Sequence, residues 1–246
     1  MGNRGLPIIE AHRGDSTNAP ENTLAAFRAA VALHALWIEL DVHPTRDGAL
    51  VVLHDDTVDR TTNGSGAVCD LTLVEIARLD AGSWFGAQFA SERIPQLREV
   101  FDVVAHTETK LNIEIKAAPP GLDVARAVVE LLRAYGKERD YVVSSFDLDA
   151  LLEVRAIAPE VTLALIGWGA DILARARQVG LPWIHAHQKT LDAAIVAEAH
   201  AAGMRVNVWT VDDPATLAAW ATMGLDKICT NRPAIMLAAA AQAMPG

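Results

Sequence analysis

Residues 183–210, WIHAHQKTLDAAIVAEAHAAGMRVNVWT, show the repeating pattern from which the fold of this chain can be inferred. Two short apolar runs, Trp183–Ala186 and Met204–Thr210, enclose an alanine-rich segment, Asp192–Ala202, that is typical of a helix. Gly203 suits the end of that helix. The stretch therefore predicts one strand–helix–strand unit.

The same alternation continues along most of the 246 residues, and about eight strand-then-helix units can be counted. Alternating strands and helices are typical of a parallel sheet covered by helices, and roughly 250 residues suit a closed (β/α)8 TIM barrel. An extra strand, Leu50–His54, follows the second strand, Leu36–Val42. An open, doubly wound sheet is the alternative, although no Gly-x-Gly-x-x-Gly motif follows the first strand to support its dinucleotide-binding form.

Residues 55–96 interrupt the alternation between the second and third units. They contain a turn-rich run, a short helical segment near Leu73–Leu79, and the aromatic pair Trp84 and Phe85. Because a structureless loop of this length is unusual inside a compact domain, we predict a small insertion subdomain within a single domain that spans residues 1–246. The aromatic pair fits a small core of that subdomain better than a substrate lid.

The composition excludes several classes of protein. Hydrophobic residues make up 51% of the chain, too many for a disordered one, and the formal charge of −10 disfavours binding to nucleic acid. No apolar stretch reaches about 18 residues, so we expect no membrane span, and residues 1–11 lack the apolar core of a secretory signal. Cys69 and Cys229 are too few for a disulfide scaffold. We therefore expect a cytoplasmic protein with both thiols reduced.

Acidic side chains lie where a barrel places its active site, at the carboxyl ends of strands. Glu39 and Asp41 lie two residues apart on one strand and so share a face, as do Glu114 and Lys116 on the next barrel strand. Three carboxylates on adjacent strands repel one another unless a cation binds between them, and hard oxygen ligands favour Mg²⁺ or Ca²⁺. The spacing predicts one divalent cation, with rim carboxylates paired to Lys or Arg as the alternative.

Two histidines and two cationic side chains complete the set. His12 and His54 each close an apolar strand, where a pair of imidazoles can share general acid and base roles, although one such histidine alone is more often structural. Arg13 and Lys116 offer donors to phosphate oxygens. Two histidines, three acids and two cations together indicate metal-assisted cleavage of a phosphate ester.

Motifs along nearly the whole chain resemble those of the glycerophosphodiester phosphodiesterases, and they occur in the same order. The motifs are His12-Arg13-Gly14, Pro20-Glu21-Asn22-Thr23, Glu39-Leu40-Asp41-Val42, Thr45-Arg46-Asp47-Gly48, His54-Asp55, Asp59-Arg60-Thr61-Thr62, Ala81-Gly82-Ser83-Trp84-Phe85, Ile94-Pro95, Glu114-Ile115-Lys116, Ser144-Ser145-Phe146-Asp147 and Val208-Trp209-Thr210-Val211. So long a series is far more specific than any single motif. The resemblance also accounts for the insertion, because this family carries a small subdomain at that point of its barrel.

The resemblance implies a (β/α)8 barrel that hydrolyses glycerophosphodiesters to sn-glycerol 3-phosphate and an alcohol. The residues that match the family's metal ligands are Glu39, Asp41 and Glu114, and those that match its acid/base pair are His12 and His54. Those that match residues near the phosphate are Arg13 and Lys116, and those that match aromatics on the glycerol side of the pocket are Phe146 and Trp209. Trp168 is a further candidate for the pocket wall. We favour His12 as the base and His54 as the acid, with Asp55 able to orient His54.

Two positions depart from the family pattern: Asn231 stands where Asp is usual, and Glu10 where an apolar residue is usual. Glu10 shares the face of His12, so it needs a partner if it points into the barrel, whereas a strand irregularity could turn it outward. On the sixth strand, His185 and His187 alternate, and one of them is expected to face the barrel mouth. It would serve there as a structural residue or as a contact to the leaving group.

Alternative functions stay open. A related barrel phospholipase that acts on lysophospholipid or sphingomyelin is the second enzyme hypothesis, and a catalytically inactive binding barrel is a hypothesis from another class. The residues do not distinguish one head group from another, Mg²⁺ from Ca²⁺, or a monomer from a homodimer. They also do not separate direct attack by water from attack by the glycerol 2-hydroxyl through a cyclic phosphate.

Overall fold

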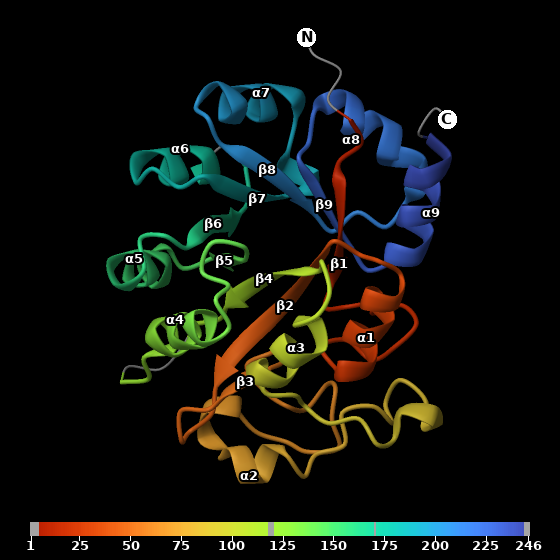
Figure 1. The fold of residues 1–246 in the computed structure, drawn as a ribbon, viewed down its shortest axis with the longest axis vertical. Helices are drawn as coiled ribbons and strands as arrows, with labels where there is room; N and C mark the ends of the chain where they lie inside the picture. The colour runs from red at the N-terminus through yellow and green to blue at the C-terminus, as the bar shows by residue number, and fades with distance from the viewer. Residues whose placement is uncertain (1–4, 118–120, 170, 244–246) are drawn as a thin grey trace.

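The computed structural model describes residues 5–117, 121–169 and 171–243, with strands in the middle of the molecule and helices around them (Figure 1). The strands are β1 (Ile8–His12), β2 (Trp37–Pro44), β3 (Leu50–Val52), β4 (Lys110–Ile115), β5 (Val142–Ser145), β6 (Thr162–Gly167), β7 (Trp183–His187), β8 (Arg205–Trp209) and β9 (Lys227–Thr230). The α-helices are α1 (Leu24–Ala32), α2 (Leu73–Ile76), α3 (Leu97–Val104), α4 (Val124–Ala134), α5 (Leu148–Ile157), α6 (Asp171–Gln178), α7 (Ala193–Ala201), α8 (Leu217–Met223) and α9 (Pro233–Ala243).

Eight of these strands close into a parallel barrel. Their order is β1-β9-β8-β7-β6-β5-β4-β2, and β2 pairs with β1 again, so that His12 lies opposite Glu39. The remaining strand, β3, pairs antiparallel with β2 at Val42 and Pro44. Closure confirms the predicted (β/α)8 TIM barrel and excludes the open sheet.

Alternation along each strand separates the two faces of the barrel wall. On β2, Ile38, Leu40 and Val42 are fully buried and belong to the large apolar core that the strands share with the helices. Glu39 and Asp41 point the other way, into the barrel. The outer layer therefore stabilises the fold, whereas polar side chains face the barrel interior, where the site lies.

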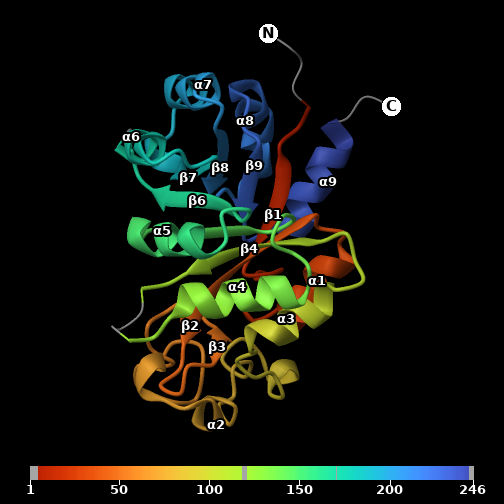
Figure 2. The same ribbon diagram turned by 60° about the vertical axis from the view of Figure 1, so that its left-hand side comes forward.

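Residues 55–96 lie at one end of the molecule, beside β3 and α3 (Figures 1 and 2). They contain α2 and the short 3-10 helices η1 (Val68–Asp70) and η2 (Ala87–Phe89). A second buried cluster holds this segment together, and its members are Val51, Leu53, Val58, Val68, Ile76, Ala81 and Ile94. The expectation that Trp84 and Phe85 form this core is wrong: Trp84 is 43% exposed, and its ring meets that of Phe85 edge-on outside the cluster.

Two differences from the predicted strand bounds concern the ends of β2 and β3. β2 continues past Val42 to Pro44, because β3 supplies a partner for these residues. β3 itself ends at Val52, so His54 lies in the turn that follows rather than in the strand. Among the described residues, no helix has the length and apolar character needed to cross a membrane.

Candidate active site

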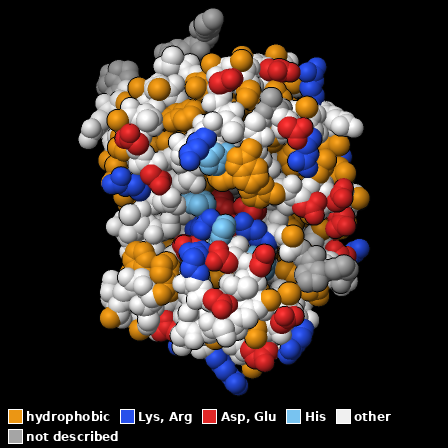
Figure 3. All heavy atoms as spheres, turned by 180° about the vertical axis from the view of Figure 1, so that it is seen from behind, with side chains coloured by type: hydrophobic (Ala, Val, Ile, Leu, Met, Phe, Trp, Pro, Cys, Tyr) orange, Lys and Arg blue, Asp and Glu red, His pale blue; other side chains and the backbone are white. Residues whose placement is uncertain are grey.

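A pocket of about 310 Å³ opens at the carboxyl ends of the barrel strands. Figure 3 shows a hollow in which acidic, basic and histidine side chains gather beside hydrophobic ones. The pocket is lined by all but one of the predicted site residues: His12, Arg13, Glu39, His54, Glu114, Lys116, Phe146, Trp168 and Trp209. The exception, Asp41, is fully buried and contacts both Arg13 and Lys116. The fold thus brings the whole predicted set together.

Three carboxylates form the centre of the site. Glu39 and Asp41 come from β2 and Glu114 from β4, and the strand register places Asp41 opposite Glu114. One carboxylate oxygen of each lies within 4.8 Å of those of the other two. Burial and mutual repulsion raise the pKa of Glu39 well above its usual value and that of Glu114 to about 7. Burial also opposes ionisation of Asp41, but Lys116 and Arg13 outweigh it and lower the pKa of that carboxyl group.

The two cationic side chains lie directly against these carboxylates. Lys116 Nζ is 2.8 Å from Asp41 Oδ1 and also bonds to Glu114. Arg13 Nε is 3.3 Å from Asp41 Oδ2, and its Nη1 donates to Glu21 at 2.8 Å. Burial works against the charge of Lys116, but the two carboxylates outweigh it and raise the pKa of Lys116 to about 12. Both cations therefore stay charged beside the place where an anion would bind.

A tight turn after β1 aims Arg13 into the site. Arg13 and Gly14 have φ angles of 58° and 84°, in the left-handed region. A Cβ atom on Gly14 would lie 2.6 Å from the backbone of Ala26, so only glycine fits here. Asn22 closes the turn with a bond from its backbone N–H to the carbonyl of Arg13, and its side chain donates to Asp41 at 2.8 Å. This turn explains why Gly14 and Asn22 occur in the first two motifs.

Hydrogen bonds on one side of the ring fix the tautomer of His12. Asn231 donates its Nδ2 hydrogen to Asp212 at 2.8 Å, which leaves Asn231 Oδ1 to accept from His12 Nδ1 at 2.6 Å. This network assigns the proton of the neutral ring to Nδ1, and Nε2, 3.8 Å from Glu39, keeps its lone pair. Burial and then the charge of Arg13 lower the pKa of His12 to about 4. The ring is therefore neutral at pH 7 and able to accept a proton.

A chain of charged groups holds His54 in the turn after β3. His54 Nδ1 is 2.7 Å from Asp55, and Arg60 donates to both oxygens of Asp55 and both of Glu21, at 2.7–3.0 Å. Glu21 in turn accepts from Arg13. Hydrogen bonds from Arg60 lower the pKa of Asp55 to about 2, so Asp55 is a charged acceptor for the Nδ1 proton of His54. The expected contact between Asp55 and His54 is present.

Phe146, Trp168 and Trp209 form an aromatic cluster at the pocket mouth. Phe146 stacks on Trp168 with ring centroids 5.0 Å apart and meets Trp209 edge-on at 5.7 Å. Trp168 is 56% exposed, whereas Trp209 is partly buried and its indole N–H donates to the carbonyl of His185 at 2.9 Å. The ring of His187 packs against Trp209. The cluster gives the pocket an apolar wall.

The structure settles two orientations that the sequence left open. Glu10 points into the barrel and does have partners: Lys227 forms a buried ion pair with it, and Asn207 donates to it at 2.7 Å. His185 lines the pocket and is buried, whereas its neighbour on the same face, His187, lies toward the rim.

Comparison with known proteins identifies the family. The Glycerophosphoryl diester phosphodiesterase family matches residues 12–235. A glycerophosphodiester phosphodiesterase of Caldanaerobacter subterraneus subsp. tengcongensis is 39% identical over 245 residues, which cover 94% of this chain and 96% of that protein. The chain belongs to the glycerophosphodiester phosphodiesterase family. The prediction that it is an enzyme of this type is therefore confirmed.

Solved structures of the family have the same fold. A phosphodiesterase of Oleispira antarctica, in complex with the product sn-glycerol-3-phosphate, is 34% identical and superposes with a TM-score of 0.89, over 95% of this chain and 96% of that one. A glycerophosphodiester phosphodiesterase of Agrobacterium tumefaciens is also 34% identical, with a TM-score of 0.82 over 95% and 100% of the two chains.

Three residues for which the sequence predicted no role contribute to the site. Glu21 and Arg60 connect Arg13 to Asp55, and Asn22 holds Asp41. Each occurs in a motif that carries the family resemblance, so the motifs contained the signal. The contacts themselves join segments up to 39 positions apart, and no local pattern reveals them.

The carboxylate group fits a hard divalent cation. Its donors are all oxygen atoms, and the pKa values of Glu39 and Glu114 are raised, so that a cation would compete with protons for these carboxylates. Without a cation, Glu114 has a higher pKa in the folded protein than its usual 4.5. At Glu114 the folded state then binds more protons than the unfolded state between these values, so the contribution of Glu114 to the free energy of unfolding decreases as pH rises from about 4.5 to about 7.

Thermal unfolding should therefore show a pH-dependent effect of added cation. Mg²⁺ or Ca²⁺ should raise the Tm more at pH 8 than at pH 5.5, because protons compete with the cation at the lower pH. Circular dichroism melts with and without cation measure the difference. In Glu114→Gln, which removes one of the two titrating groups, the pH dependence should be weaker. An equal Tm shift at both pH values in the unmutated protein would contradict the assignment.

Proposed function

We propose that this protein hydrolyses glycerophosphodiesters to sn-glycerol 3-phosphate and an alcohol, with one divalent cation, Mg²⁺ or Ca²⁺, and with His12 and His54 as the acid/base pair. The observation that carries the proposal is the convergence of three carboxylates, two histidines and two cations in one pocket. The Oleispira antarctica relative, which binds sn-glycerol-3-phosphate, supports the choice of product.

Glu39, Asp41 and Glu114 would hold the cation. When bound, it supplies positive charge to a non-bridging phosphate oxygen. Arg13 and Lys116 offer N–H donors to the remaining phosphate oxygens and stabilise the charge that develops on them. Because both side chains are already held by Asp41, they need little reorganisation when substrate binds.

His12 and His54 would divide the proton transfers. His12 is neutral at pH 7 with a free lone pair on Nε2, which suits the removal of a proton from the nucleophile. His54 has a charged carboxylate partner at Nδ1, which favours a donor role toward the leaving alcohol. His12 ends strand β1 and His54 lies in the turn after β3, so one ring can serve the nucleophile and the other the leaving group.

The wider setting of the enzyme is also part of the proposal. Residues 1–246 would form one domain with 55–96 as an insertion. Phe146 and Trp209 would contact the glycerol side of the substrate, and Trp168 would form part of the pocket wall. Cys69 and Cys229 are free thiols, in keeping with a reducing, cytoplasmic location. We propose a monomer or homodimer with a small-molecule substrate.

Substrate preference separates this function from the phospholipase alternative. An acyl chain of a lysophospholipid would extend beyond the pocket onto the rim around Trp168, whereas a glycerophosphodiester fits within about 310 Å³. We expect kcat/KM for glycerophosphocholine to exceed that for lysophosphatidylcholine by at least about tenfold, roughly 1.4 kcal/mol. Release of choline from both substrates, below the micellar concentration, measures the ratio. A preference for the lysolipid would favour the phospholipase, and binding without turnover under either cation would favour the inactive barrel.

A further inference from the structure

The pocket continues below the carboxylates into the barrel interior. Its deepest residues are Glu10, Asn112, His185, Asn207 and Cys229, which we call the pocket floor. Each of them lies two positions before a residue at the strand end and on the same face, as Asn207 does before Trp209. The floor is therefore one layer deeper than the proposed catalytic groups.

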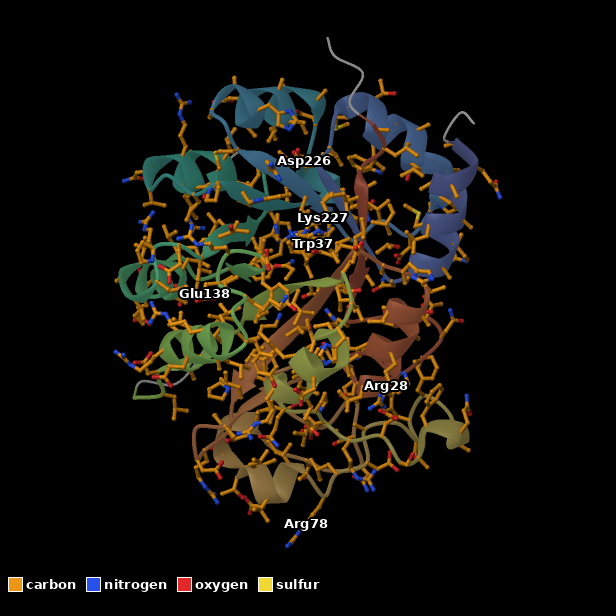
Figure 4. All side chains as sticks on the ribbon, in the orientation of Figure 1. Arg28, Trp37, Arg78, Glu138, Asp226 and Lys227 are labelled. Carbon is orange, nitrogen blue, oxygen red and sulfur yellow. The ribbon has the colours of Figure 1, made fainter. Side chains whose placement is uncertain are left out.

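The charged groups at this level neutralise each other. Lys227 and Glu10 form an ion pair in which both side chains are at most 1% exposed. The ammonium group of Lys227 also lies 4.2 Å from the ring centre of Trp37, near the middle of the barrel in Figure 4. With its carboxylate oxygens taken by Lys227 and Asn207, Glu10 offers little attraction to a cationic group. The floor suits an uncharged polar ligand.

His185 offers a hydrogen-bond donor to the pocket. Asn112 Oδ1 accepts from Ser144 at 2.9 Å, so the side-chain N–H of Asn112 faces His185 Nδ1, at 3.5 Å. This assigns the ring proton of His185 to Nε2. Among the residues that the structure describes, that Nε2 atom has no hydrogen-bond partner, although His185 is only 2% exposed.

Asn207 offers the matching acceptor. Its Nδ2 donates to Glu10, which leaves Oδ1 free to accept, and this buried oxygen also has no partner among the described residues. The register of β7 and β8 places His185 directly opposite Asn207. A donor and an acceptor thus lie side by side in a pocket, and a hydroxyl group is the ligand that satisfies both.

We propose that His185 and Asn207 bind a hydroxyl group of the glycerol arm of the substrate. The inference rests on the proposed function, and it adds a determinant of substrate choice. Trp209, two positions beyond Asn207 on the same face, would pack against the carbon chain of the arm while the hydroxyl reaches the floor. Cys229 spans the two levels: its Sγ lies within 4.8 Å of a carboxylate oxygen of Glu39, and its side chain also bonds to Glu10.

The test compares two substrates that differ only in the hydroxyl groups of this arm, glycerophosphocholine and n-propyl phosphocholine. His185→Met removes the donor and Asn207→Leu the acceptor, whereas in His185→Gln an amide N–H stands near the position of Nε2. His187→Leu is the control, because it changes a histidine on the same strand and face that is not part of the pocket lining. Melting curves for every variant report on folding.

In His185→Met and Asn207→Leu we expect kcat/KM for glycerophosphocholine to fall about tenfold, because one buried hydrogen bond to the hydroxyl is lost. We expect kcat/KM for n-propyl phosphocholine to fall less than about twofold in the same variants, because this substrate has no hydroxyl to lose a bond. In His185→Gln and His187→Leu, the ratio of kcat/KM for glycerophosphocholine to kcat/KM for n-propyl phosphocholine should be the same as in the unmutated protein. Equal losses on both substrates, or an unchanged ratio in His185→Met, would overturn the inference while leaving the proposed function intact. If Asn207→Leu does not fold, the comparison of His185→Met with His185→Gln decides alone. If n-propyl phosphocholine, which lacks the 2-hydroxyl that a cyclic-phosphate route needs, is not turned over, its inhibition constant against glycerophosphocholine replaces its kcat/KM in the comparison. No hydrolysis of glycerophosphocholine by the unmutated protein would instead contradict the proposed function.

Discussion

Replacing His12 by Ala should lower the turnover of glycerophosphocholine by about 10²–10⁴-fold, and His54→Ala should do the same. The loss follows from the geometry of the two rings. Each has Nδ1 engaged by a partner, Asn231 for His12 and Asp55 for His54, so each presents Nε2 for proton transfer. An alanine offers no atom that can take over this step.

The fold should tolerate these substitutions. His12 makes one hydrogen bond through its ring, to Asn231, and His54 lies in a partly exposed turn. We therefore expect the Tm to change by only a few degrees, because losing one partly buried hydrogen bond costs about 1 kcal/mol. His106→Ala, at an exposed position outside the pocket, is the matched control and should retain full activity. Turnover within about threefold of the unmutated value in either His12→Ala or His54→Ala would remove that residue from the proton transfers.

Much of the barrel could be predicted because its pattern is local. A strand such as β7 shows as a short apolar run, Trp183–Ala186, before a helical segment, and in the structure it extends by only one further residue, to His187. The carboxylates could be predicted for a similar reason. Glu39 and Asp41 lie two positions apart, and a strand puts such residues on one face whatever its partners are.

Contacts between distant segments could not be predicted in the same way. The ion pair of Glu10 with Lys227 joins residues 217 positions apart, and it forms because β1 and β9 are neighbours once the barrel closes. Without the closed barrel, one could not tell whether Glu10 turns outward at a strand irregularity or points inward and pairs with Lys227. The bridge from Glu21 through Arg60 to Asp55 likewise needs the insertion to fold back against the turn after β1.

Strand ends were hard to predict because tertiary pairing sets them. Leu50–His54 reads as one apolar run, but only its first three residues, to Val52, form β3. This difference in the end of β3 matters for function, because a hydrogen bond to Asp55 holds His54 in a turn that lies outside the backbone pairing of β3. The error over Trp84 has another cause: aliphatic side chains fill the small core of the insertion, which leaves the indole ring at its surface.

Removing divalent cations should cause the other large loss. Glu39, Asp41 and Glu114 are buried within a few ångströms of one another, and without a cation two of them have raised pKa values. Lys116 and Arg13 then compensate much of their charge, and Lys116 bonds to Asp41 and Glu114 rather than to a phosphate. We expect loss of the cation to lower turnover by about 10³-fold, because a metal ion contributes several kcal/mol to stabilising the transition state.

Asp41→Asn should reproduce most of that loss even when cation is abundant. The substitution removes the charge that holds both Arg13 and Lys116, and it weakens the oxygen donor set. Glu153→Gln, an exposed carboxylate on α5, is the matched control and should leave turnover unchanged. Normal cation-dependent activity in Asp41→Asn would show that this carboxylate does not belong to the site.

The most direct measurement is the release of sn-glycerol 3-phosphate from glycerophosphocholine by protein treated with a chelator and dialysed, before and after graded addition of Mg²⁺ or Ca²⁺. A site built on three carboxylates predicts that release falls to about a thousandth and returns with a saturable dependence on cation concentration. Undiminished release by the cation-free protein would contradict it.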